Sequence, residues 1–188
     1  MIILASSSPR RKELLQQIGC KFICRPSECK ELTSVDEQNP QKLVAQNAIL
    51  KATASIDPSS PQEIILGSDT VVALDNIIYG KPKNNEDAYT MLKNLSGKTH
   101  QVYTGIALIK NHEIFSDVCV TDVTMKELSD KEIHQYIATK EPLDKAGSYA
   151  IQGLASIFIE KINGCYFNVV GLPLNSLYTL CQKAGVNL

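Results

Sequence analysis

Three serines and three cations stand close together near the start of the chain, between Ser6 and Lys12. They follow a short apolar run, residues 2–5, and precede a segment with helical spacing, so we place them where a strand gives way to a helix. The first amides of a helix lack intrahelical partners and lie at the positive end of its dipole, where an anion is stabilised. Hydroxyl and guanidinium groups add hydrogen-bond donors. The stretch therefore indicates a phosphate site, and the alternative is a capped helix whose basic residues are solvated.

Asp69 is the second candidate because it follows an apolar run and stands between Ser68 and Thr70. We predict that it lies at the end of a strand, where a carboxylate can hold a metal ion or accept a proton from water. The alternative is a turn aspartate that bonds its own backbone.

Three loops supply further charged and polar side chains. Lys81 follows a glycine in a predicted turn, and the stretch DKAGSYAIQG, residues 144–153, offers Asp144, Lys145 and Gln152. The polar loop 26–38 carries four acids: Glu28, Glu31, Asp36 and Glu37. Mg²⁺ needs only one or two carboxylates when phosphate oxygens complete its shell, although charged loop residues are usually only solvated. The stretch NVVGLPLN, residues 168–175, is interpreted as a strand-to-helix junction with a structural glycine.

Capping and turn signals arrange these residues on alternating strands and helices. Ser8-Pro9 and Asn39-Pro40 start helices, Ser8 serving as the N-cap of the first, and Ser129 with Glu132 forms a capping box. Further helices are predicted over 84–96 and from Pro173 onward. Strands are predicted over 22–24, 63–80 (a strand, a break and a hairpin), 101–125 (a hairpin at 111–112) and 155–171 (a hairpin at 163–164). The pattern indicates one α/β domain over residues 1–188 with a mixed sheet.

Composition narrows the class of protein. The chain has 188 residues and a net charge of −1, so no global basic field attracts nucleic acid. No apolar run reaches the roughly 18 residues of a membrane span, and no basic region precedes the first apolar stretch. Six scattered cysteines and three histidines lack metal-ligand spacing, which favours reduced thiols in a cytoplasmic protein. Neither a Walker A loop nor a GxGxxG motif is present.

Six motifs taken in order, ASSSPRR, GSDT, GKP, HQVYTG, DKAGSYAIQG and GLP, resemble those of the Maf family of nucleoside triphosphate pyrophosphatases. The resemblance covers nearly the whole chain. It implies a mixed-sheet α/β fold with two lobes and a central cleft, related to that of the inosine triphosphatases. It also implies release of pyrophosphate from nucleotides, with a divalent metal ion as cofactor.

The subgroup follows from three positions. SPRR, a threonine after the motif aspartate, and IQG resemble the branch that acts on dTTP and UTP rather than the branch that acts on 7-methyl-GTP. Two positions depart mildly from the family pattern: Ser7, and the tripeptide at 148–150. Neither changes a charged site position.

The resemblance also implies residue roles. Asp69 matches the general base and, with Glu31, would bind Mg²⁺ or Mn²⁺. The residues expected around the triphosphate are Ser6, Arg10, Arg11, Lys51 and Lys81, the last as a catalytic residue, and those expected near the base are Thr70 and Gln152. We expect Gln152 to pair with the uracil edge, Arg10 to disfavour cytosine because it only donates hydrogen bonds, and Thr70 to help exclude purines.

Two other classes of function stay open at this point. One is a regulatory nucleotide-binding protein that affects septum formation, and the other is a phosphatase or kinase with similar anion chemistry. The expected partner is a nucleoside triphosphate, with neither nucleic acid nor membrane, and a homodimer is left open.

Overall fold

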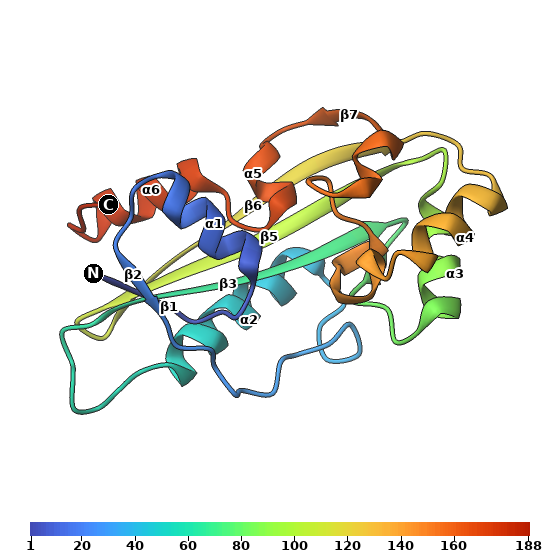
Figure 1. Cartoon of the computed structure of the whole chain (residues 1–188). Helices are drawn as coiled ribbons and strands as arrows, with labels where there is room; N and C mark the ends of the chain where they lie inside the picture. The colour runs from blue at the N-terminus through green and yellow to red at the C-terminus, as the bar shows by residue number, and fades with distance from the viewer.

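A sheet of seven strands runs the length of the molecule, and the computed structural model describes all 188 residues (Figure 1). The strand order is β2-β1-β3-β5-β6-β7, and β4 pairs separately with β3. The strands are β1 (Ile2–Leu4), β2 (Phe22–Cys24), β3 (Ile64–Leu74), β4 (Ile77–Tyr79), β5 (Thr99–Lys110), β6 (Glu113–Met125) and β7 (Ile159–Asn163). The two parallel pairs involve β1, and the others are antiparallel, so the sheet is mixed.

Helices cover both faces and one end of this sheet (Figure 1). They are α1 (Pro9–Gln17), α2 (Pro40–Ala54), α3 (Asn85–Leu95), α4 (Asp130–Ala138), α5 (Tyr166–Val170) and α6 (Leu174–Lys183). Short 3-10 helices occupy Glu141–Asp144, Ala146–Ser148 and Leu154–Phe158. Helix α2 packs on one face of β3 and β5, whereas α1, α5 and α6 lie on the opposite face.

Two glycines let α2 lie directly against the sheet. A Cβ atom at Gly67 would stand 2.1 Å from the carbonyl oxygen of Ala48, and one at Gly105 would stand 2.3 Å from that of Val44. Neither distance is possible for real atoms, so α2 could not approach β3 and β5 this closely if either residue carried a side chain.

The two largest apolar cores form at the two ends of the long strands. One contains Leu66 and Leu108 and packs against α1 and α6, and the other contains Val72 and Val102 and packs against α3 and α4. The register pairs Leu66 with Leu108 and Val72 with Val102, so the cores lie one after the other along the same strands. This arrangement confirms the expected fold, with two lobes on a shared mixed sheet.

The sheet is interrupted between the lobes. β1 pairs with residues 64–66 of β3, and β4 pairs with residues 72–74, so residues 67–71 have no neighbouring strand on that side. Because β1 is parallel to β3 and β4 is antiparallel to it, both short strands run toward this gap and end beside it. The serine-rich loop after β1 and Lys81 after β4 therefore emerge at the same place.

Several predictions from local signals are confirmed. Asn39 caps α2, Ser129 and Glu132 form the capping box of α4, and the turn at residues 111–112 joins β5 to β6 with positive φ at both positions. None of the helices combines the length and apolar character needed to cross a membrane.

Three predictions are wrong. β3 has no break, so Asp69 lies in the middle of a strand; pairing with β5 from Ile65 to Ala73 keeps the chain extended there. The predicted hairpin at 163–164 is absent, because β7 pairs with β6 and the chain then enters α5. Residues 168–175 consequently join two helices rather than a strand and a helix.

Candidate active site

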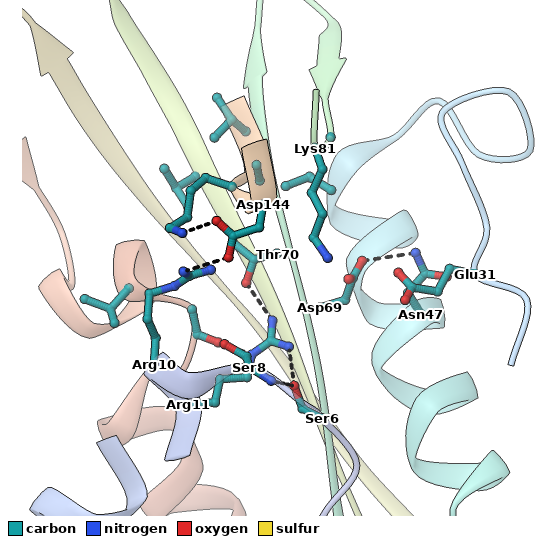
Figure 2. Close-up of a pocket in the computed structure, with 18 of the residues that line it drawn as sticks. Ser6, Ser8, Arg10, Arg11, Glu31, Asn47, Asp69, Thr70, Lys81 and Asp144 are labelled. Atoms are coloured by element: carbon teal, nitrogen blue, oxygen red, sulfur yellow. Dashed lines mark hydrogen bonds and ion pairs between the residues drawn. The ribbon is translucent and has the colours of Figure 1, made fainter. Parts of the chain in front are cut away.

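A cleft of about 630 Å³ opens at the gap in the sheet (Figure 2). Its lining comes from the loop before α1, the polar loop 26–34, α2, the middle of β3, Lys81 and the stretch 144–152. A cleft of this volume accommodates a small molecule the size of a nucleotide. Every site residue predicted from the sequence lines it: Ser6, Arg10, Arg11, Glu31, Lys51, Asp69, Thr70, Lys81 and Gln152.

Arg11 forms one wall of the cleft and is held by neutral oxygen atoms. Its Nε donates to the carbonyl oxygen of Gly171 at 2.8 Å, and its two terminal nitrogens donate to Ser6 Oγ and Thr70 Oγ1, both at 3.1 Å. Burial lowers the pKa of this guanidinium below its usual value, and the nearby negative charge of Asp69 opposes that shift. Because no carboxylate contacts Arg11 directly, its charge is available to an anion in the cleft.

The loop before α1 differs in detail from the sequence prediction. Ser8 occupies the N-cap position of α1, but its side chain makes no capping hydrogen bond. Its backbone N–H instead donates to Ser6 Oγ at 3.2 Å. The side chain of Ser6 therefore accepts hydrogen bonds from both this amide and Arg11, which fixes the loop against the helix.

Asp69 forms the opposite wall together with two residues of α2. Its Oδ1 accepts a hydrogen bond from Lys51 Nζ at 2.7 Å, and its Oδ2 accepts one from Asn47 Nδ2 at 3.0 Å. Lys51 Nζ also lies 2.9 Å from Glu31 Oε2, so a single ammonium group bridges the two carboxylates. Asp69 is only 7% exposed, and a buried carboxylate of this kind is held in place by its partners.

The two carboxylates fit a hard divalent cation. Glu31 and Asp69 both line the cleft and both contact Lys51 Nζ, so the two carboxylates lie close to each other. No group of three or more histidine, cysteine or acidic side chains gathers anywhere in the chain. Such a pair suits Mg²⁺ or Mn²⁺ if phosphate oxygens and water supply the other ligands.

Lys81, Arg10 and residues 144–152 complete the rim. Lys81 extends from the end of β4 toward the space between Arg11 and Asp69 (Figure 2). Arg10 Nη1 lies 3.8 Å from Asp144 Oδ2, and Lys145 also bonds Asp144. Burial raises the pKa of Asp144, but the hydrogen bond and charge of Lys145 and the charge of Arg10 outweigh it and lower the pKa overall. The loop that carries Gln152 is thereby tied to the start of α1.

A buried polar network supports this loop from below. Tyr136 Oη donates to Glu141 Oε1 at 2.9 Å and accepts from the amide of Ala150 at 3.3 Å. His100 Nε2 bonds the hydroxyl of Tyr149 at 2.8 Å. His100 is fully buried, and burial lowers its pKa to about 4, so its ring is neutral at neutral pH. Of the HQVYTG motif, Val102 lines the cleft, whereas His100 lies beneath it.

Sequence reasoning missed three contributors. Asn47 could have been found because it stands one helical turn before Lys51 and so shares its face of α2. Gly171 was interpreted as structural only, yet its carbonyl oxygen accepts from Arg11. Thr104 was quoted only as part of a motif, yet its hydroxyl lies 2.9 Å from that of Thr70.

Thr70 itself lies in the cleft, but its hydroxyl contacts Arg11 and Thr104. Those two contacts place its hydroxyl against the wall of the cleft that contains Arg11. The expectation that Thr70 excludes purines stays a prediction.

Comparison with solved structures identifies proteins of similar fold. The chain shares its fold with a HAM1 protein from Coxiella burnetii at a TM-score of 0.53 and 17% sequence identity, over 97% of this chain and 98% of that one. This likeness agrees with the expected inosine triphosphatase-like architecture.

Sequence comparison then defines the family. The family of Maf-like proteins matches residues 1–184, and the chain belongs to this family. A Clostridium botulinum (strain Eklund 17B / Type B) protein is 45% identical over 185 residues, which cover 97% of this chain and 98% of its own, and it is named dTTP/UTP pyrophosphatase. A Clostridium tetani protein of the same name is 46% identical over 189 residues, with coverage of 99% and 98%.

Proposed function

We propose that this protein hydrolyses dTTP and UTP to the nucleoside monophosphate and pyrophosphate with the help of a divalent metal ion. Relatives of 45% and 46% identity over nearly the whole chain carry the name dTTP/UTP pyrophosphatase. The observation that carries the proposal is the pairing of the two walls: Arg11 faces the cleft without a contacting carboxylate, and Asp69 stands across from it beside Glu31.

In the proposed reaction, a water molecule attacks the α-phosphorus and the bond between the α-phosphorus and the bridging oxygen breaks. Asp69 accepts a proton from the attacking water, while Lys51 and Asn47 hold its carboxylate in position. Arg11 and Lys81 stabilise the charge that develops on the leaving pyrophosphate. A divalent ion held by Glu31 and Asp69 would neutralise phosphate charge and make the phosphorus more electrophilic.

Base selection is proposed for the wall that contains Arg10 and Gln152. The ion pair between Arg10 and Asp144 brings the start of α1 to the loop of Gln152, so both side chains can reach one base. An amide can accept from N3–H of uracil and donate to a carbonyl, whereas a guanidinium only donates and would meet the amino group of cytosine unfavourably. We therefore propose that dTTP and UTP are preferred over CTP and over purine triphosphates.

A product assay tests the proposed activity. Purified protein is incubated with dTTP and Mg²⁺ or Mn²⁺, and pyrophosphate, orthophosphate and dTMP are quantified. Equal amounts of pyrophosphate and dTMP are expected. Orthophosphate as the first product would indicate a phosphatase, and binding without turnover would favour the regulatory nucleotide-binding protein. Omission of the metal, or addition of a chelator, is expected to abolish turnover.

A second assay tests the base preference. The ratio kcat/KM is measured for dTTP, UTP, CTP, GTP and 7-methyl-GTP with the wild type and with Arg10→Ala and Gln152→Ala. A wild-type preference for 7-methyl-GTP would contradict the subgroup. An unchanged ranking in both variants would show that neither residue reads the base. A cytoplasmic location and a homodimer also stay predictions.

A further inference from the structure

A row of hydrogen bonds leads from Arg11 into the protein interior through two threonine hydroxyls. Arg11 Nη2 donates to Thr70 Oγ1 at 3.1 Å, Thr70 Oγ1 lies 2.9 Å from Thr104 Oγ1, and Thr104 Oγ1 lies 2.9 Å from the carbonyl oxygen of Asn168. Thr104 and Asn168 are both 0% exposed. The row therefore joins a cation in the cleft to a fully buried backbone group of α5.

The number of protons that each group can donate fixes the direction of every hydrogen bond in this row. A carbonyl oxygen only accepts, so Thr104 must use its single hydroxyl proton on Asn168. Thr104 consequently has none left for Thr70, and Thr70 must donate to Thr104. Arg11 has only donors, so Thr70 accepts from it. All three bonds point from the guanidinium toward the carbonyl, and aligned hydrogen bonds of this kind strengthen one another.

The segment 168–171, which contains the carbonyl group at the end of this row, also binds Arg11 directly. The carbonyl oxygen of Gly171 accepts from Arg11 Nε at 2.8 Å, and the N–H of Gly171 donates to the carbonyl oxygen of Asn168 at 3.0 Å. A guanidinium has five N–H groups, and the bonds to Gly171, Ser6 and Thr70 occupy three of them. The orientation of the planar group is thereby fixed, and two N–H groups remain for an anion.

We propose that Thr104 is a positioning residue, which orients Arg11 through Thr70 toward the phosphates of a bound nucleotide. This inference rests on the proposed function, because it takes the ligand to be a nucleoside triphosphate. Thr70 has no proton left for the ligand, so its hydroxyl acts by holding Arg11. Thr104 of the HQVYTG motif does not line the cleft, and it thus contributes to the site through Thr70 and Arg11.

The test measures binding rather than turnover. Calorimetry gives the affinity of each variant for the α,β-methylene analogue of dTTP, which cannot be cleaved between these phosphates, in the presence of Mg²⁺. Thr104→Val keeps the shape of the side chain but removes the hydroxyl, and about 5- to 50-fold weaker binding is expected. Thr104→Ser keeps the hydroxyl and should stay within about twofold of the wild type.

Thr99→Val is the matched control. Thr99 lies on the same strand as Thr104 and pairs with the hydroxyl of Thr124 at the same 2.9 Å distance, but this pair is exposed and lies outside the cleft. The Thr99→Val variant should bind the analogue with the affinity of the wild type. Thr70→Val removes the middle of the row at a partly exposed position, and it should reproduce the loss even if Thr104→Val does not fold.

The decisive comparison uses Arg11→Ala as background. If Thr104 acts through Arg11, adding Thr104→Val to Arg11→Ala should weaken binding by less than about twofold. The proposal would be overturned if Thr104→Val weakened binding as much in the Arg11→Ala background as in the wild type. It would also be overturned if the single variant Thr104→Val bound the analogue with wild-type affinity. Binding of the analogue without hydrolysis of dTTP would refute only the proposed function, whereas absence of binding by the wild type would refute both.

Discussion

Asp69 and Thr70 are adjacent in β3, yet they serve opposite walls of the cleft. Successive side chains of a strand point to opposite faces, so Asp69 reaches Lys51 and Asn47 of α2 while Thr70 reaches Arg11 on the other face. Both line one open cleft because β3 has no neighbouring strand on the side of β1 and β4 at this point. Two consecutive residues of β3 thus belong to different walls of the site: Asp69 to the wall with Glu31, and Thr70 to the wall with Arg11.

Asp69→Asn tests the acidic half. Asparagine has nearly the same shape but cannot accept a proton at neutral pH, so kcat for dTTP should fall by about 10²–10⁴-fold. Lys51 keeps its contact with Glu31, so the variant should remain folded in a thermal melt. Asp122→Asn, which changes a strand aspartate outside the cleft, serves as the control and should retain wild-type activity. Near wild-type turnover of Asp69→Asn would show that this residue is not the base.

Asn47 provides the second residue-scale prediction because it links Asp69 to the loop of Glu31. Its Oδ1 accepts from the N–H of Leu32 at 2.8 Å, and its Nδ2 donates both to the carbonyl oxygen of Leu32 at 3.0 Å and to Asp69. The backbone contacts fix which end of the amide faces Asp69. One side chain thus sets the position of Asp69 relative to the loop that carries Glu31.

Asn47→Leu should raise the Mn²⁺ concentration for half-maximal activity by about 10–100-fold, as expected when the partner of a metal ligand is lost. The affinity for Mn²⁺ can be measured independently by calorimetry. Gln46→Leu makes the same kind of change on the exposed side of α2 and should leave both values unchanged. Equal metal affinities of Asn47→Leu and the wild type would remove Asn47 from this role.

These residues also show what the sequence could and could not predict about the site. The ordered motifs and their resemblance to the Maf family were sufficient to find the charged side chains, whereas the serines and cations before α1 alone also fitted a capped helix with solvated basic residues. Asn47 and Thr104 escaped because their importance depends on contacts distant in sequence, with Asp69 and Asn168 respectively. Such contacts exist only after the sheet has formed.

At the scale of elements, Asn47 and Lys51 reach Asp69 because α2 lies directly against β3. The substitution Gly67→Ala tests whether the site depends on this close packing. The added Cβ would stand 2.1 Å from the carbonyl oxygen of Ala48, so α2 must shift, and the free energy of unfolding should fall by about 1–3 kcal/mol. Activity should fall as well, because Lys51 and Asn47 move with the helix.

Gly80→Ala is the control for stability. A Cβ at Gly80 meets no atom within 4 Å, so urea unfolding should give a value within about 0.5 kcal/mol of the wild type. If Gly67→Ala proves equally stable and fully active, the close packing of α2 is not required for the site.

The predictions of helices and strands succeeded where the signal was local. The caps of α2 and α4 and the turn at 111–112 depend on neighbouring residues alone, and all three are confirmed. The predictions failed where pairing with a distant strand decided the outcome. Gly67 and Ser68 resembled a break, but β5 holds them in an extended strand. Residues after β7 resembled a returning strand, but hydrogen bonds from Cys165 and Asn168 to Thr121 fold them into α5 against β6.

At the scale of the whole molecule, three continuous strands join the two lobes. β3, β5 and β6 have 11, 12 and 13 residues, and both cores are built on them. Strands of this length span about 40 Å and pair along their whole shared length. The cleft between the lobes is thus framed by a sheet rather than by a flexible connection.

His100 makes the stability of this sheet depend on pH. Its pKa is about 4 in the folded protein and near 6.5 in the unfolded chain, so between these values the unfolded chain binds the extra proton. Stability is therefore lost as the pH falls from 6.5 toward 4. The contribution of this residue should be about 2 kcal/mol smaller at pH 5 than at pH 7.5.

Urea unfolding of the wild type and His100→Gln at both pH values measures this contribution. Glutamine can still bond Tyr149 but does not titrate, so the variant should lose about 2 kcal/mol less than the wild type on acidification. His112→Asn, in the exposed turn between β5 and β6, should show the wild-type dependence. If the free energy of unfolding of the wild type and of His100→Gln changed equally with pH, His100 would not be the cause of the pH dependence.

The interruption beside β3 also bears on aggregation. An exposed strand edge normally offers a template on which a strand of another molecule can grow. Here the unpaired stretch covers only residues 67–71 and is closed at both ends by β1 and β4. A foreign strand would collide with these neighbours before it could form a ladder. A central strand can therefore keep its backbone and the side chains of Asp69 and Thr70 open to small molecules while its edge is closed to other polypeptides.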